Sequence, residues 1–145
     1  MVNPNLKDLS APIEALRSDV AEAYKRLDAQ WAQIAERLKC LPIPCTISAV
    51  VDSHPRRPQA CINLEWRKWR GKYRFCYTHH DYEFDEYLND HEATEDVTPY
   101  DEWSAERRVE MLEFVPALFE NAVKQIEKFI AKTKIDGGNN ENASN

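Results

Sequence analysis

Glycine is scarce in this chain of 145 residues, which contains three. Phosphate-cradling loops and dinucleotide-binding turns need closely spaced glycines, so this scarcity excludes P-loop and dinucleotide-binding architectures. The Gly-x-Ser-x-Gly elbow of serine hydrolases is also missing. Four cysteines are present, and none has the Cys-x-x-Cys spacing of zinc or redox sites, so we expect core thiols. They are Cys40, Cys45, Cys61 and Cys76.

Long apolar runs are missing as well. No uninterrupted apolar segment is long enough to cross a bilayer, and the first ten residues lack the charged-then-apolar pattern of a signal peptide. We therefore expect a cytoplasmic protein without membrane contact. The length suits a single domain, predicted over residues 1–135, with a disordered polar tail at 136–145.

The clearest local signal is a β-hairpin over residues 62–77, where two alternating runs flank Arg70-Gly71. A short glycine-containing connection of this kind closes a hairpin. With these two residues as the loop, the alternation predicts one face in the core and one cationic face that exposes a tryptophan. The predicted cross-strand pairs are Trp69 with Lys72, Lys68 with Tyr73, Trp66 with Phe75, and Leu64 with Tyr77.

A helix is predicted on each side of the β-rich part. Residues 10–41 place an apolar residue every seven positions, with Ser10 as the expected N-cap. Residues 98–134 form a second helical region, with Thr98-Pro99 at its start and a kink or break just before Pro116. Strands are predicted at 45–52, 60–69 and 72–79. The fold class is therefore α+β in the order α-β-β-β-α, a three-stranded antiparallel meander packed by both helices.

The heptad spacing in residues 10–41 also predicts self-association. Six acidic and six basic residues balance each other across residues 1–41. We expect a homodimer through the 10–41 helix.

Charge is strongly segregated in the middle of the chain. Residues 54–78 contain seven Arg or Lys and one acid, a net charge of +6, whereas residues 81–110 contain twelve acids and two arginines, a net charge of −10. Either the acidic segment folds across the basic hairpin and neutralises it, or one of the two meets a charged partner.

Two candidate binding surfaces follow from this segregation. The first is the basic hairpin face, and the second is the acidic, aromatic-rich segment, predicted as a loop over residues 81–97. The residues of the hairpin face are Arg67, Trp69, Arg70, Lys72 and Arg74. Those of the acidic side are Tyr82, Asp85, Tyr87 and Trp103.

A histidine-rich stretch offers candidate metal ligands. Imidazole and carboxylate groups suit zinc, manganese or iron, but the spacing matches no established motif. Adjacent histidines on a strand also point to opposite faces. We therefore expect no metal or other cofactor. The candidate ligands are His79, His80, Asp81 and His91.

Taken together, the sequence favours binding over catalysis. It predicts a small non-enzymatic binding or regulatory protein, of the inhibitor, immunity-protein or adaptor kind, that contacts a protein partner through a charged and aromatic surface. One alternative is single-stranded nucleic acid or nucleotide binding by the basic hairpin. A second is a metal-dependent hydrolase that uses the histidine and carboxylate residues.

Overall fold

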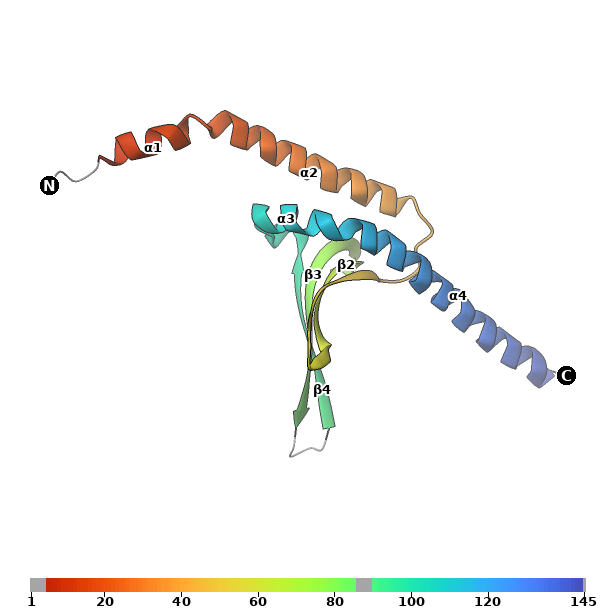
Figure 1. The fold of residues 1–145 in the computed structure, drawn as a ribbon. Coiled ribbons are helices and arrows are strands. Elements are labelled where there is room, and N and C mark those ends of the chain that lie inside the picture. Colours follow the sequence, from red (N-terminus) through yellow and green to blue (C-terminus); the bar gives the residue numbers. More distant parts are fainter. Residues whose placement is uncertain (1–4, 86–89, 145) are drawn as a thin grey trace. The chain divides into compact units, whose positions relative to one another are not determined.

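A computed structural model describes the backbone of residues 5–85 and 90–144, and their side chains except at 57–59, 82–85, 90–92 and 135–144 (Figure 1). The chain divides into two units, Met1–Arg37 and Leu38–Asn145, and each is described by itself. The prediction of one domain over residues 1–135 stays a prediction.

The N-terminal region contains two helices where one was predicted, α1 (Leu6–Glu14) and α2 (Arg17–Lys39). The predicted N-cap Ser10 is wrong, because α1 begins earlier. Asn5 is the N-cap, and its side-chain oxygen accepts a hydrogen bond from the Lys7 amide at 2.9 Å. Pro12 therefore lies inside α1, where it cannot donate a backbone hydrogen bond. The helical segment is interrupted three residues later.

The second unit contains a four-stranded antiparallel sheet in the order β1-β2-β3-β4. Its strands are β1 (Ile47–His54), β2 (Arg57–Trp69), β3 (Lys72–Asp85) and β4 (Asp90–Pro99). The predicted meander is confirmed, but the predicted number of three strands is wrong. The acidic segment 81–97, predicted as a loop, lengthens β3 and forms most of β4. Residues 93–96 of β4 are exposed, so neither face of the strand needs apolar side chains there. The sequence therefore lacks the apolar alternation from which a strand is predicted.

The predicted hairpin register is confirmed at all four pairs, from Trp69 with Lys72 to Leu64 with Tyr77. The turn has positive φ angles at both central residues, 52° at Arg70 and 91° at Gly71. This left-handed backbone matches the twist of the two strands and is the conformation that glycine adopts readily. The hairpin therefore sets the register of the centre of the sheet.

The C-terminal region consists of η1 (Tyr100–Glu102), α3 (Ala105–Met111), η2 (Leu112–Phe114) and α4 (Val115–Ser144). The predicted break just before Pro116 is confirmed, since the short 3-10 helix η2 separates α3 from α4. The predicted cap at Thr98 is wrong. Ser104 is the N-cap of α3, and its hydroxyl accepts from the Arg107 amide at 3.2 Å. Residues 136–144, predicted as a disordered tail, are helical in α4.

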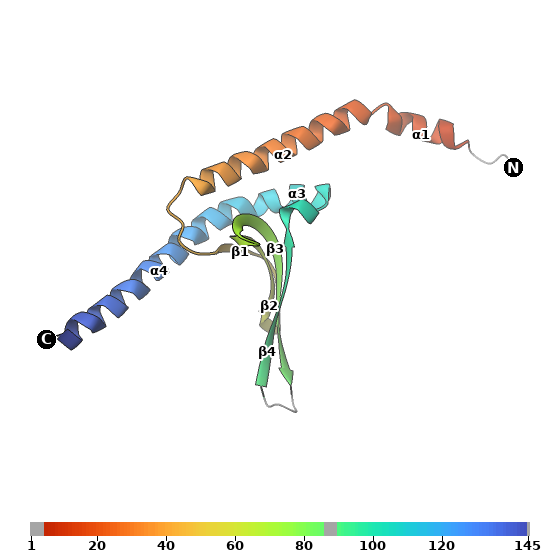
Figure 2. The same ribbon diagram turned by 180° about the vertical axis from the view of Figure 1, so that it is seen from behind.

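The apolar core of the second unit lies on one face of the sheet, under α3 and α4. Trp66 packs against Phe75 with ring centroids 4.9 Å apart. The Arg107 guanidinium of α3 lies 3.8 Å from the centroid of the Tyr77 ring on the same face. Figures 1 and 2 show the strands running from beneath these helices to a far end that no helix of this unit covers. The buried core residues of this unit include Ile47, Ala49, Leu64, Trp66, Phe75, Trp103, Met111, Leu118 and Ala122.

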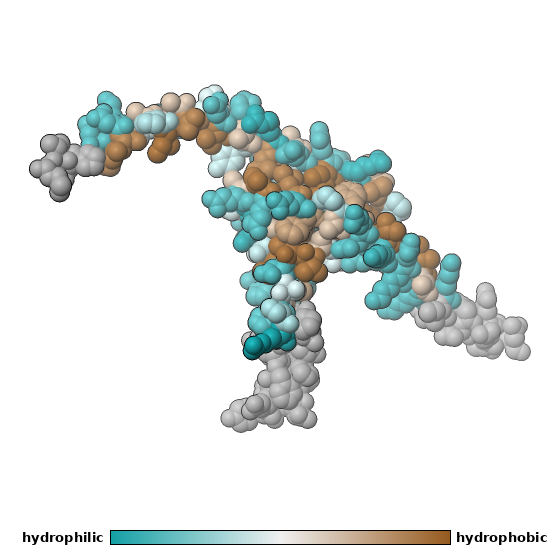
Figure 3. Space-filling model, in the orientation of Figure 1, coloured by the Kyte–Doolittle hydropathy of each residue, from teal (hydrophilic) through white to brown (hydrophobic). Residues whose placement is uncertain are grey.

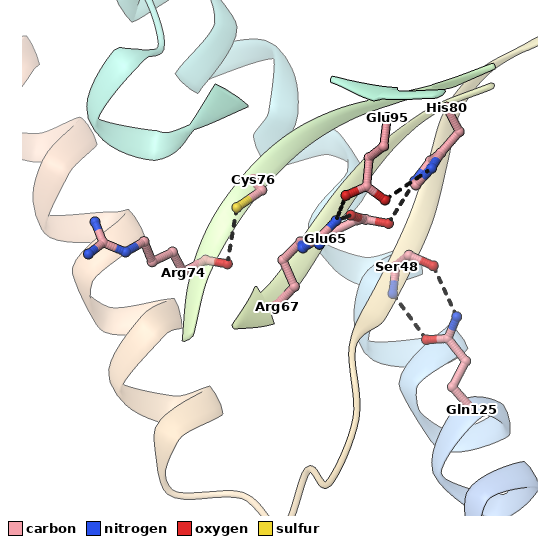
Figure 4. Close-up of polar contacts among 8 residues, drawn as sticks. All are labelled: Ser48, Glu65, Arg67, Arg74, Cys76, His80, Glu95 and Gln125. Carbon is pink, nitrogen blue, oxygen red and sulfur yellow. Dashed lines mark hydrogen bonds and ion pairs between the residues drawn. The ribbon is translucent and has the colours of Figure 1, made fainter. Parts of the chain in front are cut away.

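Helix α4 packs along β1, an edge strand of the sheet, and two of its amide side chains bind that edge. The Gln125 side chain accepts from the Ser48 backbone amide at 3.0 Å and donates to the Ser48 hydroxyl at 3.0 Å (Figure 4). Asn121 donates to the Ser48 carbonyl at 3.1 Å. The two hydrogen bonds to the Ser48 amide and carbonyl satisfy backbone groups that an edge strand otherwise leaves open.

Candidate functional site

The sheet face opposite the core carries a cluster of interacting acidic and basic side chains, of which Glu65 is buried, Arg67 and His80 are half-buried and Glu95 is exposed. This polar cluster consists of Glu65, Arg67, His80 and Glu95, from β2, β3 and β4 (Figure 4). Arg67 Nη1 donates to Glu65 Oε1 at 3.2 Å and to Glu95 Oε1 at 2.8 Å. His80 Nε2 lies 3.1 Å from Glu65 Oε2, and its Nδ1 lies 3.6 Å from Glu95 Oε2. Each base therefore contacts both carboxylates.

The polar cluster replaces the cationic surface that the sequence predicted for this face. Glu65 is 5% exposed and the Arg67 side chain 19% exposed, so the pair lies largely out of water. Burial opposes the charge of Arg67, but the hydrogen bonds to Glu95 and Glu65 outweigh it and raise the pKa of Arg67. The acidic segment thus neutralises part of the basic hairpin.

Of the other predicted residues of the hairpin face, Arg74 and Trp69 make contacts within the chain, whereas Arg70 and Lys72 are exposed. Arg74 donates to the Trp69 carbonyl at 3.1 Å and lies 3.6 Å from a carboxylate oxygen of Asp101. The Trp69 ring has Arg67 at 5.5 Å and Arg70 at 5.8 Å from its centroid, within cation–π range. Arg70 and Lys72 are exposed at the turn. A base that stacked on Trp69 would compete with these two guanidinium groups.

The predicted acidic-aromatic surface is not brought together among the described side chains. Trp103 is 4% exposed and donates from its indole nitrogen to the Thr98 carbonyl at 2.8 Å, so it is a core residue. Tyr82 and Asp85 lie in β3, but their side chains are outside the described ones, and Tyr87 lies outside the described residues. The aromatic residues interleaved with acids in this part of the sequence gave no sign that Trp103 would be buried.

The adjacent histidines lie on opposite faces, as their sequence predicts. His80 belongs to the polar cluster, whereas His79 and Asp81 line an open pocket of about 430 Å³ with His54 and Asp52. The side chain of His91 is outside the described ones. Among the described residues, no group of three or more His, Cys, Asp or Glu side chains could hold a metal ion.

The buried thiol of Cys76 lies beside the polar cluster, paired across the ladder with Glu65. Burial raises the pKa of Cys76 to about 11, because the thiolate is desolvated there. Such a thiol is a core group without the thiolate character of a nucleophile.

The largest departure from ordinary burial lies in the N-terminal helices. Six large apolar side chains of residues 6–24, from α1, α2 and the turn between them, are between 48% and 80% exposed. Their spacing of three or four residues places them along one side, where Figure 3 shows hydrophobic atoms in brown. We call this set the apolar row. Its residues are Leu6, Leu9, Ile13, Leu16, Val20 and Tyr24.

The sequence contained the signal for the apolar row, because the heptad spacing through Ile13 and Val20 predicts one apolar side. It did not separate these positions from Leu27 and Trp31, which continue the spacing and are buried. Single apolar residues on a surface are common, but a contiguous exposed set marks an interaction site.

Comparison of the chain with protein-family models, with curated proteins and with solved structures gives no match. In residues 5–85 and 90–144, no helix combines the length and the apolar character needed to cross a membrane.

Proposed function

We propose that the protein is a non-enzymatic binding protein that acts as a homodimer, assembled through the apolar row of its N-terminal helices. The observation that carries this proposal is the exposure of six large apolar side chains along one side of residues 6–24, in α1, α2 and the turn between them. Water contact with such a surface is unfavourable by roughly 25 cal/mol for each Å², so its burial favours association.

The size of the row suits a second copy of the chain. Six side chains at these exposures offer on the order of 600 Å² of apolar surface, against the roughly 800 Å² that each partner contributes to a standard interface. The spacing Ile13, Val20, Leu27 follows the heptad repeat of helices that pair with each other. Self-association also gives a closed assembly in which each row is covered.

The dimer would present two acidic bodies to a further partner. Residues 42–145 contain 13 basic and 19 acidic residues, so the whole net charge of −6 lies outside the balanced N-terminal segment. Asp96, Glu102 and Glu106 are exposed on this body. A basic protein surface is the partner that this charge favours, because complementary potentials steer encounter.

Sedimentation or light scattering on Ile13→Asp tests the assembly. A charge at the centre of the row should convert a dimer to a monomer, since a buried unpaired carboxylate is strongly unfavourable. Ser18→Asp is the matched control, because Ser18 is exposed and lies on the other side of the same segment. It should remain dimeric.

Circular dichroism should show the same helix content for both variants, because Ile13 and Ser18 are exposed in the single chain. An unmodified chain that remains monomeric across the micromolar range would contradict the proposal. So would an Ile13→Asp variant that dimerises as tightly as Ser18→Asp.

A further inference from the structure

We infer that the open pocket near the far end of the sheet binds a lysine or arginine side chain of the basic partner. This pocket lies in the second unit, and its lining includes Asp52, His54, Ile62, His79 and Asp81. It is formed by β1, β2 and β3 toward the end of the sheet that the helices of this unit leave uncovered (Figures 1 and 2). The inference rests on the basic partner of the proposed function, and it names the place where that partner is held.

A β-bulge aims the Asp52 carboxylate into this pocket. The ladder between β1 and β2 is shifted by one residue after Val50. Without this shift, Val51 would pair with Ile62, and an apolar side chain would stand in this row of the sheet. Asp52 pairs with Ile62 instead. Bulges re-aim side chains in this way and are common next to functional sites.

The ladder also sets the width of the pocket. Ile62 pairs with Asp52 on one side and with His79 on the other. Because neighbouring strands lie about 4.8 Å apart, the backbones of Asp52 and His79 are about 10 Å apart, with Ile62 between them. Ala60 and Pro55 extend this apolar floor, and the pocket has a volume of about 430 Å³. A floor of this kind suits the methylene stem of a long basic side chain.

The backbone holds two polar groups of the lining in place. Asp52 Oδ1 accepts a hydrogen bond from the Ser53 amide at 2.9 Å, which leaves Oδ2 to accept from a ligand. His54 Nδ1 accepts from the Arg56 amide at 3.1 Å. In the neutral ring the proton then lies on Nε2, which can donate. The lining thus offers a carboxylate for the cation of a basic residue and a donor for its backbone carbonyl.

The charge around the pocket favours a cation. Among the described residues, the lining contains two carboxylates, Asp52 and Asp81, and no lysine or arginine. The surrounding strand segments, residues 52–62 and 79–96, contain nine acids and two arginines, a net charge of −7. A surplus of this size exceeds what one bound amine can neutralise. It therefore favours a partner that presents several basic residues over a free small amine.

Fluorescence anisotropy with a labelled peptide tests the site. The probe is acetyl-Arg-Ser-Arg-Ser-Arg amide, and the same peptide with citrulline in place of arginine is its neutral control. Asp52→Asn should weaken binding of the arginine peptide about threefold to tenfold, because it removes the carboxylate that the bulge aims into the pocket. Glu120→Gln removes the same charge from an exposed position of α4, outside the pocket, and should weaken binding by less than about 1.5-fold.

Two further measurements separate a pocket from a charged surface. Ala60→Leu fills the apolar floor without a change of charge and should weaken binding at least about threefold. If Ala60→Leu does not fold by circular dichroism, Ala60→Val carries the same prediction. In NMR spectra, the His79 imidazole signals should move as the peptide is added. Those of His80, on the opposite face, should stay in place.

Three outcomes overturn the inference in distinguishable ways. If Asp52→Asn and Glu120→Gln weaken binding equally, overall charge holds the peptide, which rejects the pocket and retains the basic partner. If acetyl-arginine amide alone binds as tightly as the peptide, the pocket takes a small cation and not a side chain of a partner. If the arginine peptide does not bind the unmodified chain, the pocket and the basic partner both fail, whereas the homodimer is decided separately by Ile13→Asp.

Discussion

The apolar row and the polar cluster reverse the usual distribution of side chains in opposite directions. The row exposes leucine, isoleucine, valine and tyrosine, whereas the cluster buries a carboxylate and largely buries a guanidinium. Each reversal is unfavourable alone. The cluster is compensated within the chain, because Arg67 and His80 each reach both Glu65 and Glu95.

The difference indicates what each region is for. A buried charge must find its partners when the chain folds, so the polar cluster is a feature of the fold. An exposed apolar surface can find its partner after folding, so we propose that the apolar row is a feature of assembly. Stability measurements should therefore respond to the cluster and to the core, and measurements of association should respond to the row.

The same substitution in the core and in the row separates these two roles most strongly. Leu64→Ala should lower the free energy of unfolding by about 2–5 kcal/mol, because Leu64 is fully buried and leaves a cavity. Leu9→Ala, at an exposed position of the row, should change it by less than about 0.5 kcal/mol when measured at dilutions that favour monomer. Urea denaturation of both variants is the measurement. A large loss for Leu9→Ala would place the row in the folded core.

Removal of the cation from the polar cluster should have the next largest effect. Arg67→Met leaves two carboxylates with His80 as their remaining base, and we expect a loss of about 2–4 kcal/mol in thermal or urea unfolding. Lys68→Met on the same strand is the control, since Lys68 is exposed and should change stability by less than about 0.5 kcal/mol. Equal effects in the two variants would mean that the cluster contributes nothing to the fold.

The thiol beside the cluster should be protected from alkylation. With its pKa raised to about 11, Cys76 holds its proton at pH 8 and should react with iodoacetamide at least about a hundredfold more slowly than in urea. The folded chain holds the Cys76 proton more tightly than the unfolded chain does. Cys76 therefore contributes to the free energy of unfolding at pH values below the ordinary thiol pKa, and this contribution is lost as the pH rises toward 11. Peptide mass spectrometry follows the reaction, and the exposed Cys40 should be modified first. Rapid native labelling of Cys76 would contradict its burial.

Local chemistry explains which elements the sequence predicted. The hairpin register follows from the turn, because Arg70-Gly71 fixes every pair of the two alternating strands. The break before Pro116 follows from the missing backbone donor. Strand β4 was missed because the exposed end of a sheet needs no apolar face, and Glu95 and Asp96 resemble a loop in composition. Ser10 was predicted as the N-cap because serine caps helices well, but asparagine caps equally well and Asn5 is the cap of α1.

The candidate surfaces were harder to predict than the fold. Arg67 was expected on a cationic face, but its partner Glu95 lies 28 residues away on the strand that was missed. Trp103 was expected on a surface, but its burial depends on the Thr98 carbonyl and on the elements around it. Spacing alone identified the apolar side of the N-terminal segment, because a helix places residues three and four apart together.

The binding of Ser48 by Gln125 and Asn121 has a consequence for how copies of this chain can meet. A strand that approached the β1 edge at Ser48 would find the backbone amide and carbonyl already occupied by side chains. At the opposite edge, β4 contains four acidic residues among its ten, so two such edges would repel. Growth of the sheet from one copy into the next is therefore opposed at both edges, which disfavours β-aggregation and leaves the helices as the surface for the association that we propose.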